Sequence, residues 1–459
     1  MKAKTKAIIL AAGLGKRMKS ALHKLLHPIL GKTVIRYVVE AALEAGIQFD
    51  DITIVVSPGR DDVKNELTSL WPGIKFALQN EPLGTGHAAQ AGVGEITADD
   101  NAIILCGDMP LITGELINDL INFNTKNPSD AVVTALYAPK MTDFGRVYSD
   151  DSGFFSEIIE ARDLKPEHPK TDLVNTGVYF FKGDALIQGL KGMKNDNSQQ
   201  EYYLTDVPKI LKESGKAVRV FEAKCNEAVF TGVNTQAQLA DAVKHMQTRI
   251  NAMHMENGVR MTDPSSVYID STVKIAADAI IYPGVILEGD CKIEANAIIG
   301  ANCNLKDTTV GKKAHIRQSV SDSAVIGEGT QVGPFAYLRP GTVTGKGCRV
   351  GNFVEIKNAN LGDGVKMAHL SYIGDADVGD GVNYSCGAIT ANYDGKNKFR
   401  TTIEANAFIG SNANLVAPVT VGEGAFVAAG STITDSLPSE ALGIARARQT
   451  IKPDWAKPK

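Results

Sequence analysis

The chain has 459 residues, of which 44% are hydrophobic and 22% charged, so it has the composition of a globular protein and is too long for one ordinary core. Its formal net charge of −4 supplies no electrostatic footprint for nucleic acid or an anionic membrane, and we expect neither as a partner. Its six cysteines are scattered without the spacing of a metal site, a pattern typical of reduced structural thiols in the cytoplasm.

The first apolar run, residues 7–10, follows a basic start, as the core of a secretory signal does. Glycines at positions 13 and 15 end the run too early for a signal peptide. No later stretch approaches the roughly 20 apolar residues of a membrane span. We therefore expect a cytoplasmic protein.

Up to about residue 230, short apolar runs alternate with helix-like stretches, which predicts an α/β domain. The runs are continuously apolar, as strands buried on both faces of a largely parallel sheet are. Strands are expected at residues 6–10, 52–57, 102–106, 131–138 and 174–181, and a helix at residues 34–43. The pattern predicts a Rossmann-like, mostly parallel sheet over residues 1–230.

A connector follows this domain. Apolar residues recur at steps of three and four over residues 235–257, and Asn257-Gly258 supplies a stop, so one helix is predicted there. We interpret residues 231–257 as a linker helix between two domains.

From residue 258 to 459 the period changes to six. Aliphatic residues fall at consecutive six-residue steps from Ile269 to Leu305, then, with Thr344 the one exception, from Ile326 to Ile356, and again from Ile403 to Ile433. Hexapeptide repeats of this kind predict a parallel β-helix in which three hexads complete one coil. Residues 392–400 interrupt the repeat and are predicted to form a protruding loop. The period alone fixes neither the handedness of the coil nor the number of subunits.

The segment after the first predicted strand is rich in glycine and is followed by cations. Glycines let backbone N–H groups approach phosphate oxygens, and Arg17 and Lys24 add positive charge. Taken alone, the motif is neither a dinucleotide fingerprint nor a P-loop, and a tight strand-to-helix turn explains it equally well. The residues expected around a phosphate are Leu10, Ala11, Ala12, Gly13, Arg17 and Lys24.

Two further segments favour a ligand site in this domain. Gly107 and Asp108 come just after a predicted buried strand, where open α/β sheets bind ligands. The Asp108 carboxylate can ligate Mg²⁺, and a helix N-cap is the alternative. Gly84 and Thr85 begin what we expect to be a flexible loop, with a plain turn as the alternative, and the amide of the preceding Gln79 can read the edge of a base.

Together these segments resemble the sugar-nucleotide pyrophosphorylases. The resemblance rests on Leu-Ala-Ala-Gly-x-Gly-x-Arg-Met at residues 10–18, Lys24, Leu-Gly-Thr-Gly-His-Ala at 83–88 and Gly-Asp-x-Pro at 107–110. Further matches follow in the family's order: Phe144-Gly145-Arg146, Ile159-Glu160, Asn175-Thr176-Gly177, residues 201–206 and Gly232-Val233-Asn234. With the hexad domain included, nearly the whole chain is similar to the bifunctional N-acetylglucosamine-1-phosphate uridyltransferase/glucosamine-1-phosphate acetyltransferases.

The resemblance implies that the first domain transfers a uridyl group from UTP to N-acetylglucosamine 1-phosphate and releases pyrophosphate. It implies Mg²⁺ between Asp108 and Asn234, although Asn234 by itself is typical of a loop asparagine, and it implies Arg17 and Lys24 as catalytic cations on the phosphates. Holding two anions in line while cations neutralise the developing charge needs no covalent intermediate. The implied base and sugar contacts are Gln79, Gly84 and Thr85 on uracil, and Gly145, Glu160 and Asn175 on the sugar.

For the second domain, residues 352–372 resemble the family's acetyltransferase site. The resemblance implies that His369 takes the proton of a sugar amine attacking acetyl-CoA, and that Glu355 orients His369. Without the resemblance, a lone histidine in a solenoid is typical of a surface residue. The implied glucosamine-phosphate contacts are Arg339, Lys357, Tyr372 and Asn383. The implied acetyl-CoA contacts are Cys386, Asn392, Tyr393, Ser411, Ala429 and Arg446.

The resemblance also implies a left-handed coil and a homotrimer whose acetyl-transfer sites form between neighbouring β-helices. Acetylation of glucosamine 1-phosphate would come first and uridyl transfer second, which yields UDP-N-acetylglucosamine for cell-envelope precursors if the host is a bacterium.

The chain departs from the family's usual residues in both domains. Ala368 stands where Gly is usual, and residues 385–388 read Ser-Cys-Gly-Ala where the family has Gly-Ala-Gly-Thr. Lys16, His23 and Gln200 replace a common Thr, Pro and Gly. None of these changes removes a charged or titrating group, but they alter the expected geometry, more for acetyl transfer than for uridyl transfer.

Two alternatives follow. The chain is a nucleotidyltransferase whose β-helix serves only as an oligomerisation or regulatory platform, or it is a binding solenoid with a degenerate nucleotide-binding domain. The presence of His369 and Glu355 argues against the first alternative, and that of Asp108 and Asn234 against the second.

Overall fold

The structure, a computed structural model, describes residues 3–197 and 200–457, and these divide into two compact units between Met246 and Gln247. The division falls within helix α7 (Gln236–Glu256), at the place where the sequence predicts a single helix. In the part of the chain that the structure describes, no helix is both long and apolar enough to cross a membrane.

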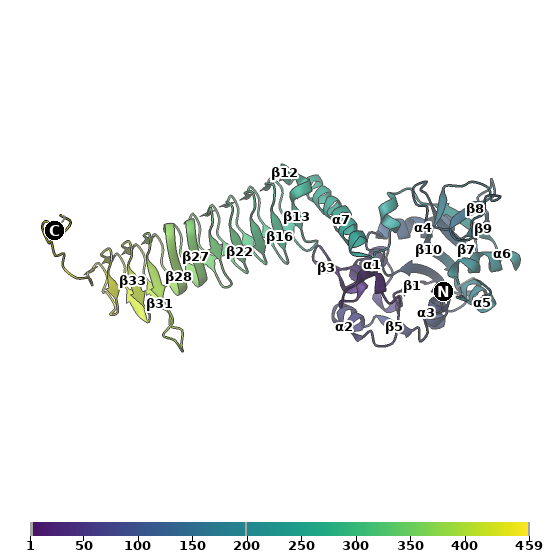
Figure 1. Ribbon diagram of the computed structural model, residues 1–459, viewed down its shortest axis with the longest axis horizontal. Helices are drawn as coiled ribbons and strands as arrows, with labels where there is room; N and C mark the ends of the chain where they lie inside the picture. Colours follow the sequence, from purple (N-terminus) through teal and green to yellow (C-terminus); the bar gives the residue numbers. More distant parts are fainter. Residues whose placement is uncertain (1–2, 198–199, 458–459) are drawn as a thin grey trace. The chain divides into compact units, whose positions relative to one another are not determined.

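The first unit is built on one twisted sheet (Figure 1). The strand order is β11 (Val218–Glu222), β7 (Ala131–Tyr137), β10 (Leu173–Lys182), β6 (Asn101–Cys106), β1 (Thr5–Leu10), β4 (Ile52–Val56) and β5 (Lys75–Leu78). All neighbours are parallel except β10, which runs antiparallel to both β6 and β7. The five predicted strands and the mostly parallel sheet are confirmed. Strands β8 (Arg146–Ser149) and β9 (Phe155–Ile159) extend the sheet beside β10.

Helices cover both faces of this sheet. On one side α1 (Val34–Glu44), the predicted helix, packs against α4 (Gly114–Lys126). A separate cluster of buried side chains joins the other face to α3 (Thr85–Gly92), α5 (Gly183–Gly192) and α6 (Val207–Glu213). A further helix, α2 (Asp61–Leu70), follows β4.

The expectation of a flexible loop at Gly84 and Thr85 is wrong, because helix α3 begins at Thr85. Gly84 takes the N-cap position with φ 101°, a conformation that favours glycine. Gly92 lies so close to the sheet that an added Cβ would come within 2.6 Å of Ile8 and 2.7 Å of Val55. Gly84 thus lets the helix begin, and Gly92 lets it approach the sheet closely.

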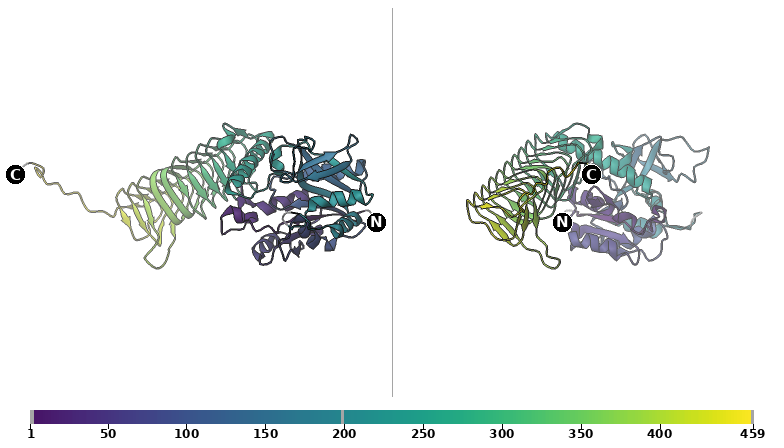
Figure 2. Two further views of the ribbon diagram at one scale, coloured as in Figure 1. Left: turned by 45° about the vertical axis from the view of Figure 1, so that its right-hand side comes forward. Right: turned by 60° about the vertical axis from the view of Figure 1, so that its left-hand side comes forward.

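The second unit is a parallel β-helix whose strands stack in sequence order, as the views in Figure 1 and Figure 2 show. From Tyr268 on, the first coils pair each strand with the strand 18 residues later, as Tyr268 does with Ile286 and Ile280 with Ile298. Three hexads thus complete one coil, as predicted. Almost all hexad residues from Ile269 to Ile433 are buried inside the coil, while Ile275 in the first coil is half-buried.

A second buried column lies two residues before each hexad aliphatic. Valine and alanine dominate it, and Cys291, Cys303 and Cys348 occupy equivalent places. All six cysteines are free, and burial raises the pKa of these three thiols. These cysteines therefore serve the core of the β-helix as small apolar residues.

The coil length changes in two regions. Between Asn304 and Gln331 paired residues lie only 16 apart, as for Thr309 and Val325. Beyond β27 (Arg349–Leu361) and β28 (Lys366–Val378), the pairing of Ile389 with Asn414 spans 25 residues. The longer coil contains the predicted protruding loop at residues 392–400, which projects near β31 (Thr401–Ile403) in Figure 1.

Candidate active sites

The first site lies where the strand order of the sheet switches direction. The chain runs from β1 to β4 and β5 on one side, and then returns to β6 on the other side of β1. The Gly107 N–H donates to the Leu10 carbonyl over 2.9 Å, which joins the turns after β6 and β1. An added Cβ at Gly107 would lie 3.0 Å from that carbonyl oxygen, so the two turns approach as closely as glycine permits.

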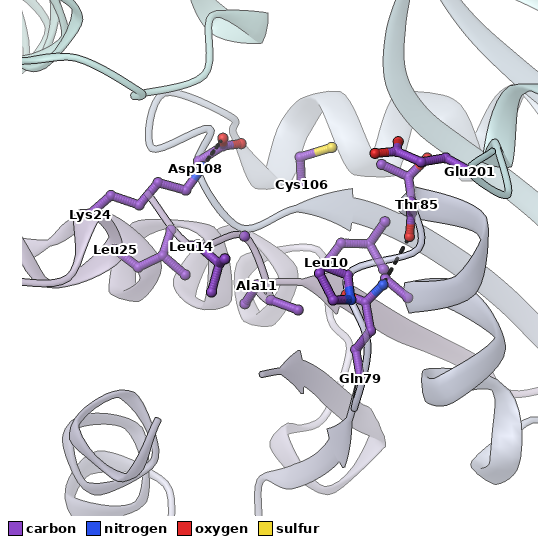
Figure 3. Close-up of a pocket in the computed structure, with 15 residues that line it drawn as sticks. Leu10, Ala11, Leu14, Lys24, Leu25, Gln79, Thr85, Cys106, Asp108 and Glu201 are labelled. Atoms are coloured by element: carbon purple, nitrogen blue, oxygen red, sulfur yellow. Dashed lines mark hydrogen bonds and ion pairs between the residues drawn. The ribbon is translucent and has the colours of Figure 1, made fainter. Parts of the chain in front are cut away.

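A cavity of about 280 Å³ opens beside these turns (Figure 3). Nine of the residues expected on the nucleotide line it: Leu10, Ala11, Ala12, Gly13, Lys24, Gln79, Gly84, Thr85 and Asp108. Arg17 does not line this cavity and is exposed on a short 3-10 helix, η1 (Lys16–Met18).

The cation end of the cavity centres on Lys24. Its Nζ lies 2.6 Å from Asp108 Oδ2 and 2.9 Å from Asn234 Oδ1, and its side chain is only 9% exposed. The Val233 N–H donates to the Asp108 carbonyl over 2.8 Å and so holds Asn234 beside β6. Residues that are 84 and 210 positions from Lys24 in the chain thus meet on one ammonium group, as Figure 3 shows for Asp108.

The oxygens of Asp108 and Asn234 fit a magnesium ion. Both are hard oxygen donors, and they already converge on one cation, the Lys24 ammonium. Among the described residues no three His, Cys, Asp or Glu side chains form a metal-binding group. A site with two protein oxygens, completed by phosphate and water, suits Mg²⁺ because this ion keeps several waters and favours phosphate ligands.

The other end of the cavity is formed by α3 and the residue before it. Gln79 is 6% exposed and donates from Nε2 to the Gly84 carbonyl over 3.0 Å. The Gly86 N–H donates to the Tyr202 carbonyl over 2.8 Å, and Glu201 lines the cavity. The sequence reasoning did not assign Glu201 to the site, although it lies in the matched segment 201–206.

The three residues expected on the sugar come together beside this cavity. The Asn175 N–H donates to the Gly145 carbonyl over 2.8 Å, and an added Cβ at Gly145 would lie 3.4 Å from Glu160 Oε2. Thr205 donates to Glu160 over 3.0 Å, and both line a neighbouring cavity of about 570 Å³ with Asp206. Burial, with a smaller contribution from the Glu160 carboxylate, raises the pKa of Asp206.

The second site lies on the long strands β27 and β28. Strand register places His369 beside Asn352, and Glu355 between Tyr337 and Tyr372. The Glu355 carboxylate accepts from Arg339 Nη1 over 2.7 Å, and this contact raises the pKa of Arg339. In the part of the unit that the structure describes, no hydrogen bond joins Glu355 to His369.

Three of the residues expected on acetyl-CoA follow His369 along one side of the β-helix, namely Cys386, Ser411 and Ala429. His369, Cys386, Ser411 and Ala429 have equivalent places in successive coils, following the same coil lengths as the strand pairing. The Gly430 N–H donates to the Ser411 carbonyl over 2.8 Å, and Arg446 Nη1 donates to the Ala429 carbonyl over 2.9 Å. His369 and these residues thus form one continuous edge.

A cation cluster lies at the base of the protruding loop. The Lys398 ammonium next to Lys357 lowers the pKa of Lys357. Asp375 is 7% exposed, lies 3.9 Å from Lys357 Nζ and accepts from the side-chain amides of Asn358 and Asn392. Sequence reasoning missed Asp375 and Lys398, because an aspartate at a coil corner and a lysine in a loop carry no signal of their own.

One chain does not gather all of the expected acetyl-transfer residues. Asn383 pairs with Lys366 and Phe408 in one column of strands, whereas Glu355 and Tyr372 pair with each other in another. Tyr393 is 59% exposed on the protruding loop.

Comparisons with known proteins agree with this architecture. Residues 7–143 match the MobA-like NTP transferase domain family, and residues 272–307, 323–358 and 400–435 match the bacterial transferase hexapeptide repeat. The chain is 44% identical over 98% of its length to a bifunctional protein GlmU from Exiguobacterium sibiricum, covering 99% of that relative. It is 43% and 42% identical, each over 99% of its length and 98% of the relative, to GlmU proteins from Halalkalibacterium halodurans and Clostridioides difficile.

Proposed function

The chain belongs to the family of bifunctional GlmU proteins, and from this premise we propose which of its residues serve each of the two reactions. The protein is a nucleotidyltransferase and an acetyltransferase that makes UDP-N-acetylglucosamine. The left-handed β-helix transfers an acetyl group from acetyl-CoA to glucosamine 1-phosphate, and the α/β domain then transfers a uridyl group from UTP to the product. The assignment of residues to these steps is our proposal, with the domains taken as residues 1–230 and 258–459 joined by the linker 231–257.

For uridyl transfer, the meeting of Lys24, Asp108 and Asn234 carries the assignment. The glycine-rich turn after β1 offers its N–H groups to the phosphates of UTP, while Gln79 and the start of α3 hold the base. A phosphate oxygen of N-acetylglucosamine 1-phosphate, held by Gly145, Glu160 and Asn175, attacks the α-phosphorus, and pyrophosphate leaves. Arg17 and Lys24 neutralise the charge that develops.

Mg²⁺ would be held by Asp108 and Asn234, where it supplies positive charge to the phosphate oxygens in the transition state. Lys24 already balances the Asp108 charge in this arrangement, so the residues of the site are ordered before the metal and nucleotide arrive. With its charge on Asp108 no longer needed, Lys24 would then be available to the phosphates.

For acetyl transfer, the edge that runs from His369 through Ser411 to Ala429 carries the assignment. Acetyl-CoA lies along this edge with Cys386 and Arg446, and its thioester reaches His369. The amine of glucosamine 1-phosphate attacks the thioester carbonyl, His369 Nε2 or Nδ1 takes the amine proton, and the proton then goes to the departing CoA thiolate. Arg339 and Lys357 hold the sugar phosphate.

We further propose that the complete acetyl-transfer site forms between copies of the β-helix in a homotrimer. Asn383 and the Glu355–Tyr372 pair belong to different strand columns, so a neighbouring copy can bring them together. In such a site Glu355 orients His369 from the facing subunit. A cytoplasmic location follows from the co-substrates, because UTP and acetyl-CoA are supplied there.

Two single substitutions test this division of labour in the full-length protein. His369→Ala should lower sugar-dependent CoA release by roughly 10²–10⁴-fold, the usual contribution of a general base, and leave uridyl transfer unchanged. Asp108→Asn should abolish most UTP-dependent pyrophosphate release and leave acetyl transfer unchanged. If the wild type released pyrophosphate but no CoA, the β-helix would be a platform only, and Ala368 and Cys386 would be the first residues to replace by the family's Gly and Ala.

A further inference from the structure

His23 is a buried imidazole next to the phosphate-binding turn, and no role has been assigned to it so far. It is 5% exposed and precedes the short helix η2 (Lys24–Leu26), whose residue Leu26 donates to the His23 carbonyl over 2.9 Å. The ring Nε2 lies 3.2 Å from the Gly13 carbonyl oxygen. A side chain ten residues away in the chain thus reaches the turn that lines the nucleotide cavity.

The partner of Nε2 fixes the tautomer of the ring. A carbonyl oxygen only accepts, so Nε2 must carry a proton, and in the neutral ring Nδ1 is then bare. Nδ1 is buried, and none of the described residues donates to it. A proton added to Nδ1 would also find no acceptor in the described structure, so this environment favours the neutral ring.

Lys24, the next residue, contacts the same turn. Added Cβ atoms at Gly13 and Gly15 would lie 3.6 Å and 3.1 Å from the Lys24 side chain. The His23 imidazole therefore donates a hydrogen bond to a carbonyl of the turn, while the aliphatic part of Lys24 packs along the same turn. The two side chains come from adjacent residues. Without the hydrogen bond from the ring to the Gly13 carbonyl, the distance between the turn and the Lys24 side chain would no longer be fixed from this side.

We propose that His23 is a positioning residue of uridyl transfer, which holds the Gly13 carbonyl from Nε2 and so fixes the phosphate-binding turn relative to Lys24. This inference rests on the proposed role of the turn in binding UTP. The uncharged ring is the working form, because a second ring proton would place a charge beside the Lys24 ammonium in a buried site.

The charges around the ring agree with this form. Burial lowers the pKa of His23 from its ordinary value of 6.5, and the hydrogen bond to Gly13 opposes part of this effect. Arg60 and Lys24 also favour the neutral ring, whereas Asp62 of α2 favours the charged one. Because the pKa is lowered in the folded chain, the contribution of His23 to stability is complete above about pH 6.5 and declines as the pH falls below that value.

Two substitutions separate the hydrogen bond from the rest of the side chain. His23 has φ −61°, which lies in the range that a proline ring fixes, so His23→Pro keeps the backbone conformation and removes the bond. In His23→Gln the side-chain amide nitrogen takes a place similar to that of Nε2, donates to the same carbonyl and does not titrate. Acetyl transfer by the same polypeptide is the internal control for both variants.

At pH 7.5 His23→Pro should lower kcat/KM for UTP by roughly two- to tenfold, the usual share of one hydrogen bond, mainly through KM. His23→Gln should stay within twofold of the wild type, and its Tm should fall less than that of the wild type when the pH falls from 7 to 5.5. Acetyl transfer should not change. An unaltered kcat/KM in His23→Pro, or an equal loss in His23→Gln, would overturn the proposal.

The imidazole itself provides a readout that depends on neither reaction. Nitrogen-15 NMR of the histidine rings should show His23 with a proton on Nε2 and a bare Nδ1, titrating below its ordinary pKa of 6.5. The opposite tautomer, or titration at that ordinary value, would refute the contact with Gly13. If the wild type showed no uridyl transfer, the proposed function would fail, and the ring signals would still decide whether His23 holds the Gly13 carbonyl.

Discussion

Substitution of Gly84 by alanine tests whether the first turn of α3 must keep its position for uridyl transfer. Gly84 has φ 101° and ψ 175°, a backbone region that only glycine occupies without strain. An added Cβ would also lie 2.6 Å from the Tyr202 carbonyl oxygen, which is backbone and cannot swing away. The strain alone costs about 1–3 kcal/mol, and the chain can relieve it only by moving residues 84–86 away from Tyr202.

This movement would separate the Gly84 carbonyl from Gln79 Nε2, which lie 3.0 Å apart, and so disturb the base end of the cavity. If the strain must be overcome when UTP binds, kcat/KM for UTP falls roughly 5- to 150-fold, because each 1.4 kcal/mol is a factor of ten. The assay is pyrophosphate release at subsaturating UTP, with CoA release as the internal control for the other domain.

Gly94→Ala is the matched control. Gly94 is an exposed glycine shortly after the end of α3, and its φ is not in the left-handed region. No neighbouring atom lies within 4 Å of an added Cβ there. This substitution should leave both activities unchanged and alter stability by less than about 1 kcal/mol. Uridyl transfer within twofold of the wild type in Gly84→Ala, with an unchanged Tm, would refute the reasoning.

Further predictions concern the thiols and the core of the β-helix. Iodoacetamide at pH 7.5 should label the exposed Cys386 and spare Cys106, because burial raises the pKa of Cys106 to about 12, and acetyl-CoA should protect Cys386 in peptide mass spectrometry. Labelling of Cys386 that ignores acetyl-CoA would contradict its place on the acetyl-CoA edge. Leu338→Ala should destabilise the β-helix by about 2–5 kcal/mol in thermal unfolding, because Leu338 is fully buried. Leu370→Ala, at a leucine that is 60% exposed, is the control, and equal losses in the two variants would contradict the assigned coil register.

The fold was predictable because each unit repeats a simple pattern. Strand β4 has all five residues buried, and a continuously apolar run of that length between turn residues indicates a central parallel strand. The hexapeptide pattern was a still clearer signal. One aliphatic residue every six positions matches neither the 3.6-residue period of a helix nor the simple alternation of a strand. Helix α3 was missed because glycine weakens a helix locally, while its close packing on Ile8 and Val55 depends on the tertiary structure.

Local sequence identified the residues of the first site better than it identified their partners. Asp108 and the turn at residues 10–13 follow buried strands, and strand order alone brings those two ends together. That Lys24 would bridge Asp108 and Asn234 could not be inferred from spacing, because the contact spans 210 positions. The same holds for Glu355, which sequence reasoning pairs with His369 and which the structure pairs with Arg339 in one chain.

The irregular coils explain why the second site is harder to predict than the β-helix that carries it. The hexapeptide repeat matches break off at residues 308–322 and 359–399, the two regions where coil length departs from 18 residues or a loop is inserted. The second gap contains His369, Tyr372, Asn383, Cys386, Asn392 and Tyr393, half of the twelve residues proposed for acetyl transfer. In a regular hexad most residues either fill the core or form the bend of the coil. Coils of irregular length have more positions at which a polar side chain can serve a reaction. Substitutions of buried residues such as Leu287 or Ile299 within 272–307 should therefore lower the Tm of the β-helix with little direct effect on acetyl transfer, whereas substitution of the exposed His369 within 359–399 should do the reverse.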